Sequence, residues 1–222
     1  WMHQIGAAPT SSIKTLEEIV ETVRALLHGE TVTVDQNDVH LDHVRMTQTP
    51  AVQPPLYVGA MREKTLQLAG RIGDGTILAE IGSPAYVRWA KQHIQAGMAE
   101  SGRTQHRIAI YHEAKVNPDG ENARAIMRRT LVTRFTWAHP HLKALGILED
   151  ATALIEKYGQ DAAAHIPDAW VDELSASGTP DQAAAAIHRL ADAGADSIIL
   201  QPLDGDPDCL DEYIRYLLPA LK

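Results

Sequence analysis

The sequence predicts an α/β fold in which parallel strands are joined by helical crossovers, and three stretches carry this prediction. Residues 54–80 follow the order strand, glycine turn, helix, strand, which is the pattern of a parallel crossover unit. Residues 107–116 alternate apolar and polar side chains as a strand does. Residues 179–200 give a helix that starts with a proline and ends at a glycine, followed by another apolar strand.

The first of these stretches has a small-residue turn at its centre. The apolar run Leu56–Val58 stops at Gly59-Ala60, and after a helical pattern a second run, Thr76–Ala79, opens. In such a unit the carboxyl end of a strand meets the amino end of a helix, where free N–H groups and the helix dipole favour an anion. We interpret Gly59-Ala60 as a candidate site for a cofactor phosphate. A plain strand-to-helix turn, with the glycine for tightness, is the alternative.

The segment before this unit is predicted to be a helix and an irregular excursion. Thr15 begins a capping-box pattern, and apolar residues repeat at helical spacing up to Gly29, a normal helix stop. Residues 31–34 and 39–41 are short alternating pieces within the excursion that leads to the prolines at 54 and 55. We therefore expect one amphipathic helix before the central strand.

The segment after the unit is predicted to alternate helices with two further strands. Ser83-Pro84 starts a helix that ends before Gly102, and the strand at 107–116 follows. Residues 120–166 are helical and irregular, with breaks at Pro140 and Gly146. The chain then gives, in order, a short helix at 167–174, a helix from Thr179-Pro180 to Ala193, a strand at 197–200 and a helix at 207–218.

Composition limits the classes of partner. The chain has 222 residues, of which 45% are hydrophobic, and 20 basic against 29 acidic side chains give a net charge of −9. An acidic chain without a basic patch is a poor partner for nucleic acid or an anionic membrane, and no apolar run approaches the length of a membrane span. The single cysteine, Cys209, excludes an internal disulfide, so we expect a reducing cytoplasm; the neighbouring aspartates are expected to raise its pKa.

Four segments together resemble a known family. They are PPLYVGA, LAGRIGDGTI, SPAYVRWA and SGTPDQAAAAIHRLADAGADSIILQPL, and their order and spacing are similar to those of the luciferase-like flavin- or F420-dependent oxidoreductases from about Thr15 to the C-terminus. The resemblance implies a TIM-barrel-like (β/α)8 fold of the luciferase-like type. Its second half is evident here as four parallel strands near Leu56, Ile77, Ile110 and Ile199. We expect residues 1–222 to form a single domain that lacks the N-terminal strands of the barrel.

Working groups in parallel α/β barrels lie at the carboxyl ends of the strands, because the βα loops emerge there. That rule selects Gly59 to Lys64, Glu80, residues 113–115 and Gln201, each of which lies at or just after the end of a predicted strand. The resemblance adds that the loop after the fifth barrel strand holds the phosphate-bearing tail of the flavin. The candidate cofactor-binding residues are Gly59, Ala60, Met61, Arg62, Lys64 and Glu80.

Each of these candidates has a simpler alternative. Arg62 and Lys64 lie at the end of a helix that disfavours cations, which suggests that an anion offsets them, but both also read as solvated surface charges. Glu80 directly follows a strand and could orient a polar ring edge or a substrate hydroxyl, or it is a loop acid. No catalytic acid or base is assigned. A metal site is not expected, since His139 and His141 point to different faces of a helical segment.

The predicted function is an oxidoreductase that transfers a hydride between F420, or alternatively reduced FMN, and a small organic substrate. Such cofactors carry the redox chemistry, and the protein supplies position and electrostatics. The alternative of another class is a non-catalytic flavin-binding or structural protein with a trimmed barrel. A homodimer is expected, because four strands alone would leave sheet edges and an apolar face uncovered.

Overall fold

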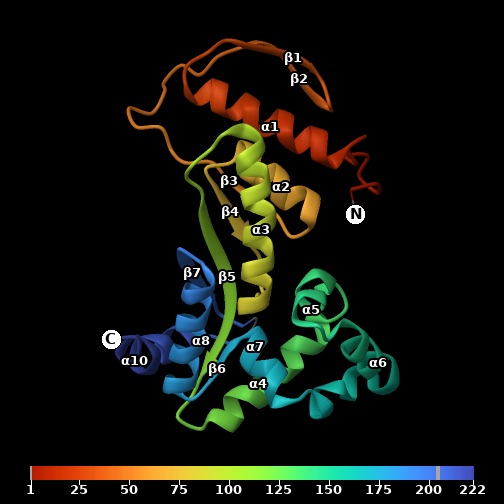
Figure 1. Cartoon of the computed structure of the whole chain (residues 1–222), viewed down its shortest axis with the longest axis vertical. Helices are drawn as coiled ribbons and strands as arrows, with labels where there is room; N and C mark the ends of the chain where they lie inside the picture. The colour runs from red at the N-terminus through yellow and green to blue at the C-terminus, as the bar shows by residue number, and fades with distance from the viewer. Residues whose placement is uncertain (1, 204–205) are drawn as a thin grey trace. The chain divides into compact units, whose positions relative to one another are not determined.

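The computed structural model describes residues 2–203 and 206–222, which form two compact units (Figure 1). The first unit comprises the residues up to Thr76 together with His93–His106, and the second comprises Ile77–Gln92 and Arg107–Lys222. The single-domain interpretation of residues 1–222 stays a prediction.

The first unit opens with helix α1 (Ser12–Leu27) and a hairpin of β1 (Val32–Gln36) and β2 (Val39–Val44). The two strands pair antiparallel, and the turn residues Asn37 and Asp38 both have positive φ, as a two-residue hairpin turn requires. The predicted start of α1 at Thr15 was wrong. Thr15 lies inside the helix, and its Oγ1 donates to Asp38 Oδ2 at 3.1 Å, so its hydroxyl fastens the hairpin turn rather than capping the helix.

The predicted crossover unit is present in the order β3 (Tyr57–Gly59), α2 (Glu63–Ile72) and β4 (Gly75–Leu78), with β3 and β4 as neighbouring strands. Helix α3 (Pro84–Ser101) follows, starting at the predicted proline. Within the first unit α2 and the later part of α3 touch backbone to backbone. A Cβ on Gly70 would lie 2.0 Å from Ile94 O, and one on Gly97 would lie 1.8 Å from Gln67 O. The two helices can approach this closely only because neither glycine has a side chain.

Asp74 ties together the segments around the crossover. Its carboxylate accepts from Leu56 N at 2.8 Å, pairs with Arg24 of α1 at 3.0 Å and also pairs with Arg103. Partial burial alone would raise the pKa of Asp74, but the Leu56 N–H and the two arginines outweigh it and hold that pKa below its usual range. One carboxylate thus fixes α1, the start of β3 and the chain after α3 around the entry to β4.

The second unit is built on β5 (Arg107–Val116), the long green strand of Figure 1 and the strand that the sequence predicted most clearly. It pairs in parallel with β7 (Ser197–Gln201) along residues 109–113 and with β6 (Ala176–Gly178) along residues 114–116. Strand β6 makes the sheet five-stranded, so the prediction of four strands missed one. Its Ala-Ser-Gly sequence contains no apolar run that could mark a strand.

The helices of the second unit confirm the predicted helical region and its breaks. After β5 come α4 (Gly120–Arg134), α5 (His139–Leu145), α6 (Leu148–Tyr158) and the 3-10 segment Gly159–His165. The remaining helices are α7 (Asp168–Leu174), α8 (Pro180–Ala193), α9 (Cys209–Glu212), a π-helical turn at Tyr213–Leu217 and α10 (Leu218–Ala220). The single C-terminal helix predicted at 207–218 is therefore interrupted.

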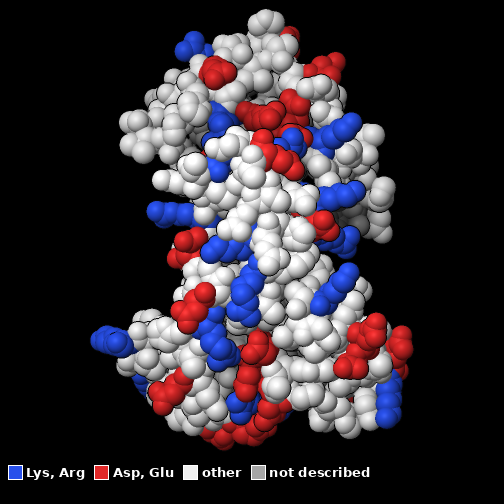
Figure 2. Space-filling model, viewed as in Figure 1, with Lys and Arg blue, Asp and Glu red and all other residues white. Residues whose placement is uncertain are grey.

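Buried apolar side chains of α4, α5, α7, α8 and the strands β5 and β6 form the core of the second unit. Charged side chains pair around it; Arg128 of α4, for example, pairs with Glu121 at 2.7 Å and with Asp168 of α7. Figure 2 shows Lys and Arg interspersed with Asp and Glu over the visible face. Among residues 2–203 and 206–222, no helix combines the length and the apolar character needed to cross a membrane.

Candidate functional site

Five of the six predicted cofactor-binding residues lie together on the turn between β3 and α2 in the first unit. Gly59 is the last residue of β3, Ala60 is buried, and α2 begins at Glu63. Met61 precedes the helix, and the side chains of Arg62 and Lys64 are exposed on either side of its first residue. The turn therefore presents two cations at the amino end of a ten-residue helix, as predicted from the sequence.

The start of α2 is shaped by Thr65 rather than by a charged cap. Thr65 Oγ1 accepts from Arg62 N at 3.2 Å and donates to Arg62 O at 2.8 Å. These bonds use the backbone of Arg62 and leave its guanidinium outside the capping interaction. The first backbone N–H groups of an α-helix have no acceptor within the helix, so they are available to an anion.

The electrostatics of this turn fit a phosphate. In the part of the chain that the structure describes, neither Arg62 nor Lys64 forms an ion pair, and Glu63 is the only acid in the first helical turn. Two cations at the positive end of a helix dipole repel it unless an anion offsets them. A phosphate there would be held by charge-assisted hydrogen bonds, which are the stronger kind.

Gly59 is not required by contacts inside the chain. A Cβ built on it would meet no atom of residues 2–203 and 206–222 within 4 Å, and its φ is not in the left-handed region. The alternative, that a glycine is needed here because the turn is too tight for a side chain, is therefore not supported by the packing around Gly59. Open space beside a backbone at the end of a strand is what a ligand that approaches closely would need.

The sixth candidate, Glu80, lies in the second unit, after β4. Its φ is +66°, an unusual value for a residue with a side chain, and Gly82 N donates to its carbonyl oxygen at 3.0 Å. Its Oε2 atom lies 3.1 Å from Nε of Arg134, the last residue of α4. The Glu80 carboxylate is therefore paired with a cation of its own unit, and its role in cofactor binding stays a prediction.

Arg134 also pairs with Glu113, one of the strand-end residues predicted on β5. Its Nε and Nη2 atoms donate to Glu113 Oε1 at 2.9 Å and 2.5 Å. The Glu113 side chain is only 2% exposed, so this carboxylate is buried with the guanidinium against it. Glu80, Glu113 and Arg134 form a compact acidic cluster in which one guanidinium serves two carboxylates.

The second unit also buries two histidines. His112 precedes Glu113 on β5, and the ring of His141 of α5 lies against that of Tyr86, with ring centroids 3.8 Å apart and the planes tilted by 35°. In the described chain both ring nitrogens of His141 and Nδ1 of His112 lack a hydrogen-bond partner. Burial lowers the pKa of His112 to about 4 and that of His141 to about 3, with His112 adding to the shift of His141. Both rings are therefore neutral at pH 7.

Replacing His141 by Phe is expected to reduce the acid sensitivity of folding. A histidine whose folded pKa is depressed stabilises the fold above its unfolded pKa of about 6.5 and loses that contribution as the pH falls toward the folded value, at about 1.4 kcal/mol per pH unit. His141→Phe removes this loss for one of the two rings, and Phe keeps the packing on Tyr86. Urea unfolding at pH 7, 6 and 5 measures the slope. The exposed His139→Phe is the control, and an unchanged slope in His141→Phe contradicts the prediction.

The third strand-end candidate, Lys115, is held at the end of β5 by the C-terminal segment. Its Nζ atom donates to Asp206 Oδ2 and Glu212 Oε2, each at 2.6 Å. Burial alone would lower the pKa of Lys115, but the two carboxylates outweigh burial and raise it. Nearby, burial raises the pKa of the Cys209 thiol and Asp206 adds to this, in the predicted direction. Lys115 is thus a fixed cation that anchors the loop after β7.

Sequence reasoning missed the partners that complete these clusters. Arg134 and Glu212 lie in helices and reach residues of β5 that are 21 and 97 positions away. No local pattern marks a helical arginine or glutamate as the partner of a strand residue. For His141 the sequence holds a signal, since His139 and His141 are a close pair, but only the structure separates the exposed ring of His139 from the buried ring of His141.

The sequence of the chain is similar to those of several known proteins. A sequence model described as luciferase-like monooxygenase matches residues 2–197. The 5,10-methylenetetrahydromethanopterin reductase of Archaeoglobus fulgidus is 28% identical over 234 residues, covering 99% of this chain and 70% of its own length. The F420-dependent glucose-6-phosphate dehydrogenase of Beutenbergia cavernae is 34% identical over 110 residues, which cover 49% of this chain and 33% of that protein.

Two solved structures share the fold. The F420-dependent tetrahydromethanopterin reductase of Methanopyrus kandleri superposes with a TM-score of 0.77 at 21% identity and covers 93% of this chain. An F420-dependent secondary alcohol dehydrogenase, solved with an F420-acetone adduct, superposes with a TM-score of 0.71 at 19% identity over 100% of this chain. This chain spans 63% and 66% of those two chains.

Proposed function

The chain belongs to the luciferase-like monooxygenase family, and we propose on that premise that it transfers a hydride between F420 and a small organic substrate. Support comes from its relatives, since the reductase of Methanopyrus kandleri and several similar dehydrogenases are F420-dependent by name. A Baeyer-Villiger monooxygenase of Pseudomonas putida that was solved in complex with FMN has a similar fold, with a TM-score of 0.60 at 16% identity, so we keep reduced FMN as the alternative cofactor.

The observation that carries the proposal is the turn between β3 and α2. It offers two exposed cations, Arg62 and Lys64, at a helix amino end, with open space at Gly59. We assign the phosphate-bearing tail of the cofactor to this turn, with Ala60 and Met61 lining its approach. Both F420 and FMN carry such a phosphate, so the turn supports either cofactor.

The protein's part in the reaction is binding and orientation. The bound cofactor would supply a ring carbon or nitrogen that accepts or gives up a hydride. Arg62 and Lys64 would fix its anionic end. In the second unit, Glu80, whose carboxylate lies 3.1 Å from Arg134 Nε, is proposed as a further residue that holds a polar group of the cofactor or a substrate hydroxyl, because a paired carboxylate keeps one direction.

Replacing Arg62 by Glu is expected to weaken cofactor binding at least tenfold. The change removes a charge-assisted contact, worth about 1.5–3 kcal/mol, and adds repulsion toward a phosphate. Titration of the purified chain with F420, and separately with FMN, measures the dissociation constant by absorbance or fluorescence.

Lys14→Glu is the matched control for that experiment, because it makes the same change of charge at an exposed position in α1 of the same unit. It is expected to leave both dissociation constants within a factor of two. Unchanged binding of both cofactors by Arg62→Glu would remove the assignment of the phosphate to this turn. Loss of only one cofactor would identify which of the two the turn binds.

We also infer a homodimer in a reducing cytoplasm. On β5 and β7, Tyr111 and Ile199 are register partners, and 38% and 37% of their surfaces are exposed, so the sheet presents an apolar pair that a second copy would cover. The buried single cysteine suits a compartment in which disulfides do not form. Sedimentation equilibrium checks the first point, and a monomer at micromolar concentration would contradict it.

A further inference from the structure

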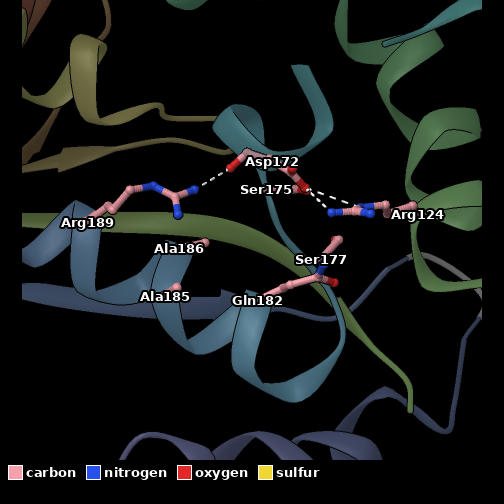
Figure 3. Close-up of a pocket in the computed structure, with 8 residues that line it drawn as sticks. All are labelled: Arg124, Asp172, Ser175, Ser177, Gln182, Ala185, Ala186 and Arg189. Atoms are coloured by element: carbon pink, nitrogen blue, oxygen red, sulfur yellow. Dashed lines mark hydrogen bonds and ion pairs between the residues drawn. The ribbon is translucent and has the colours of Figure 1, made fainter. Parts of the chain in front are cut away.

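A cavity of about 150 Å³ lies in the second unit between α4, α7, β6 and α8 (Figure 3). It is lined by two alanines of α8 and by six polar residues, namely Arg124, Asp172, Ser175, Ser177, Gln182 and Arg189. None of these six residues belongs to the turn between β3 and α2 or to the cluster around Arg134. The cavity is thus a feature that the proposed function does not use.

The cationic groups of the cavity outnumber its acids. Figure 3 shows Arg124 and Arg189 extending toward Asp172 from opposite sides. Arg124 Nη2 donates to Asp172 Oδ1 at 2.8 Å, whereas Arg189 Nη2 donates to the backbone oxygen of Asp172 at 2.7 Å. Only one guanidinium is therefore neutralised by the carboxylate, and the lining carries a net charge of about +1.

Several hydrogen-bond donors of the cavity have no acceptor from the described part of the protein. In the described chain, Arg189 Nε is buried and has no hydrogen-bond partner. Ser177 Oγ accepts from Lys115 N, and Gln182 Oε1 accepts from Thr179 N. The hydroxyl proton of Ser177 and the amide protons of Gln182 therefore remain available to a ligand. A buried charged donor without an acceptor is costly, which favours an occupant that accepts hydrogen bonds.

We propose that this cavity binds a protonated oxyanion of the phosphate class, either inorganic phosphate or a small phosphomonoester. The unbalanced charge and the free donors of Arg189, Ser177 and Gln182 suit an anion with several acceptor oxygens. The volume equals that of about five liquid waters, which is enough for a group with four oxygens. Asp172 adds selectivity, because its carboxylate accepts the proton of hydrogen phosphate but repels sulfate, which has none to donate.

Calorimetric titration of the purified chain, at pH 6.5 and fixed ionic strength, tests the proposal with inorganic phosphate, sulfate and chloride. Saturable binding of phosphate, tighter than that of sulfate by at least tenfold, is the expected result. Phosphoserine in the same assay separates the two sources: affinity equal to that of phosphate identifies a phosphomonoester site, and exclusion identifies a site for the free ion. Absence of any heat beyond that of chloride overturns the proposal.

Two variants with different expected effects, and one control variant, make the test specific. Arg189→Gln is expected to weaken phosphate binding at least tenfold, while Arg215→Gln, an exposed arginine of the same unit, leaves it unchanged. Asp172→Asn is expected to remove the preference for phosphate over sulfate, because an amide no longer demands a proton from the ligand. Undiminished binding in Arg189→Gln, or retained selectivity in Asp172→Asn, overturns the proposal. Since no F420 or FMN is used, failure here is distinct from failure of the proposed function.

Discussion

Arg134→Met is expected to lower the free energy of unfolding by about 3 kcal/mol, the largest single effect expected of this molecule. Removing one partner of a buried ion pair typically costs 3–5 kcal/mol, because the remaining charge stays in a medium that solvates it poorly. Here the guanidinium serves both Glu80 and Glu113, and the Glu113 side chain is only 2% exposed. We take the lower end of that range, because the Arg134 side chain itself is 19% exposed.

Urea unfolding at pH 7 measures this effect in a double-mutant cycle, which compares the wild type with Arg134→Met, Glu113→Gln and the double variant. Arg129→Met is the matched control, since Arg129 lies on the same helix and is exposed. Adding Glu113→Gln to Arg134→Met is expected to recover more than half of the loss, because the uncompensated charge is then removed. Exposed ion pairs contribute only about 0–1 kcal/mol to stability. If Arg134→Met changes the free energy of unfolding by less than about 0.5 kcal/mol, water solvates the charges of the cluster and the prediction is wrong.

Gly97→Ala is expected to lower the free energy of unfolding by about 2 kcal/mol or more. Alanine in a helix is normally more stable than glycine by about 1 kcal/mol, so propensity alone predicts the opposite sign. The added methyl would lie 1.8 Å from Gln67 O and 2.7 Å from Gln67 C, both backbone atoms that cannot rotate away. Helices α2 and α3 would have to separate, and overpacking of this kind costs about 1–3 kcal/mol and occasionally more.

Far-UV circular dichroism during urea unfolding measures the change, with Gly59→Ala as the control. Gly59 belongs to the same unit, and its added methyl would meet no atom of the described residues within 4 Å. The free energy of unfolding of Gly59→Ala is therefore expected to change by less than about 0.5 kcal/mol. A stabilised Gly97→Ala would mean that the helices move apart without loss and that the close crossing is not needed for folding.

The sequence predicted those elements whose signals are local. Helices α3 and α8 begin at Pro84 and Pro180 as predicted, and β5 has the predicted bounds, because prolines and alternation act over a few residues. The strand β6 was missed because its residues are small and its position depends on pairing with Ala114–Val116, 62 positions earlier in the chain. The start of α1 was placed too late because Thr15 bonds to a hairpin rather than to its own helix.

The candidate site also has parts that local sequence predicts and parts that depend on contacts between distant residues. The turn at Gly59–Lys64 could be predicted, since a strand, a glycine and a helix start are consecutive in the sequence. The cluster of Glu80, Glu113 and Arg134 could be predicted only in part, because its carboxylates follow strands but its cation ends a helix. The cavity around Arg189 could not be predicted at all, since it depends on how four elements pack.

The pairing of β5 also has a consequence for the time course of folding. The contacts that fix this strand join it to residues far downstream: Ile108 to Asp196, Lys115 to Glu212 and Ala114 to Tyr213, at separations of 88, 97 and 99 residues. At 5–20 residues per second a ribosome needs roughly 5 to 20 seconds to supply those partners. During that interval the edge of β5 that later pairs with β6 and β7 has no partner and is open to association with other chains. Charged residues on such a strand, here Glu113 and Lys115, are expected to oppose its aggregation.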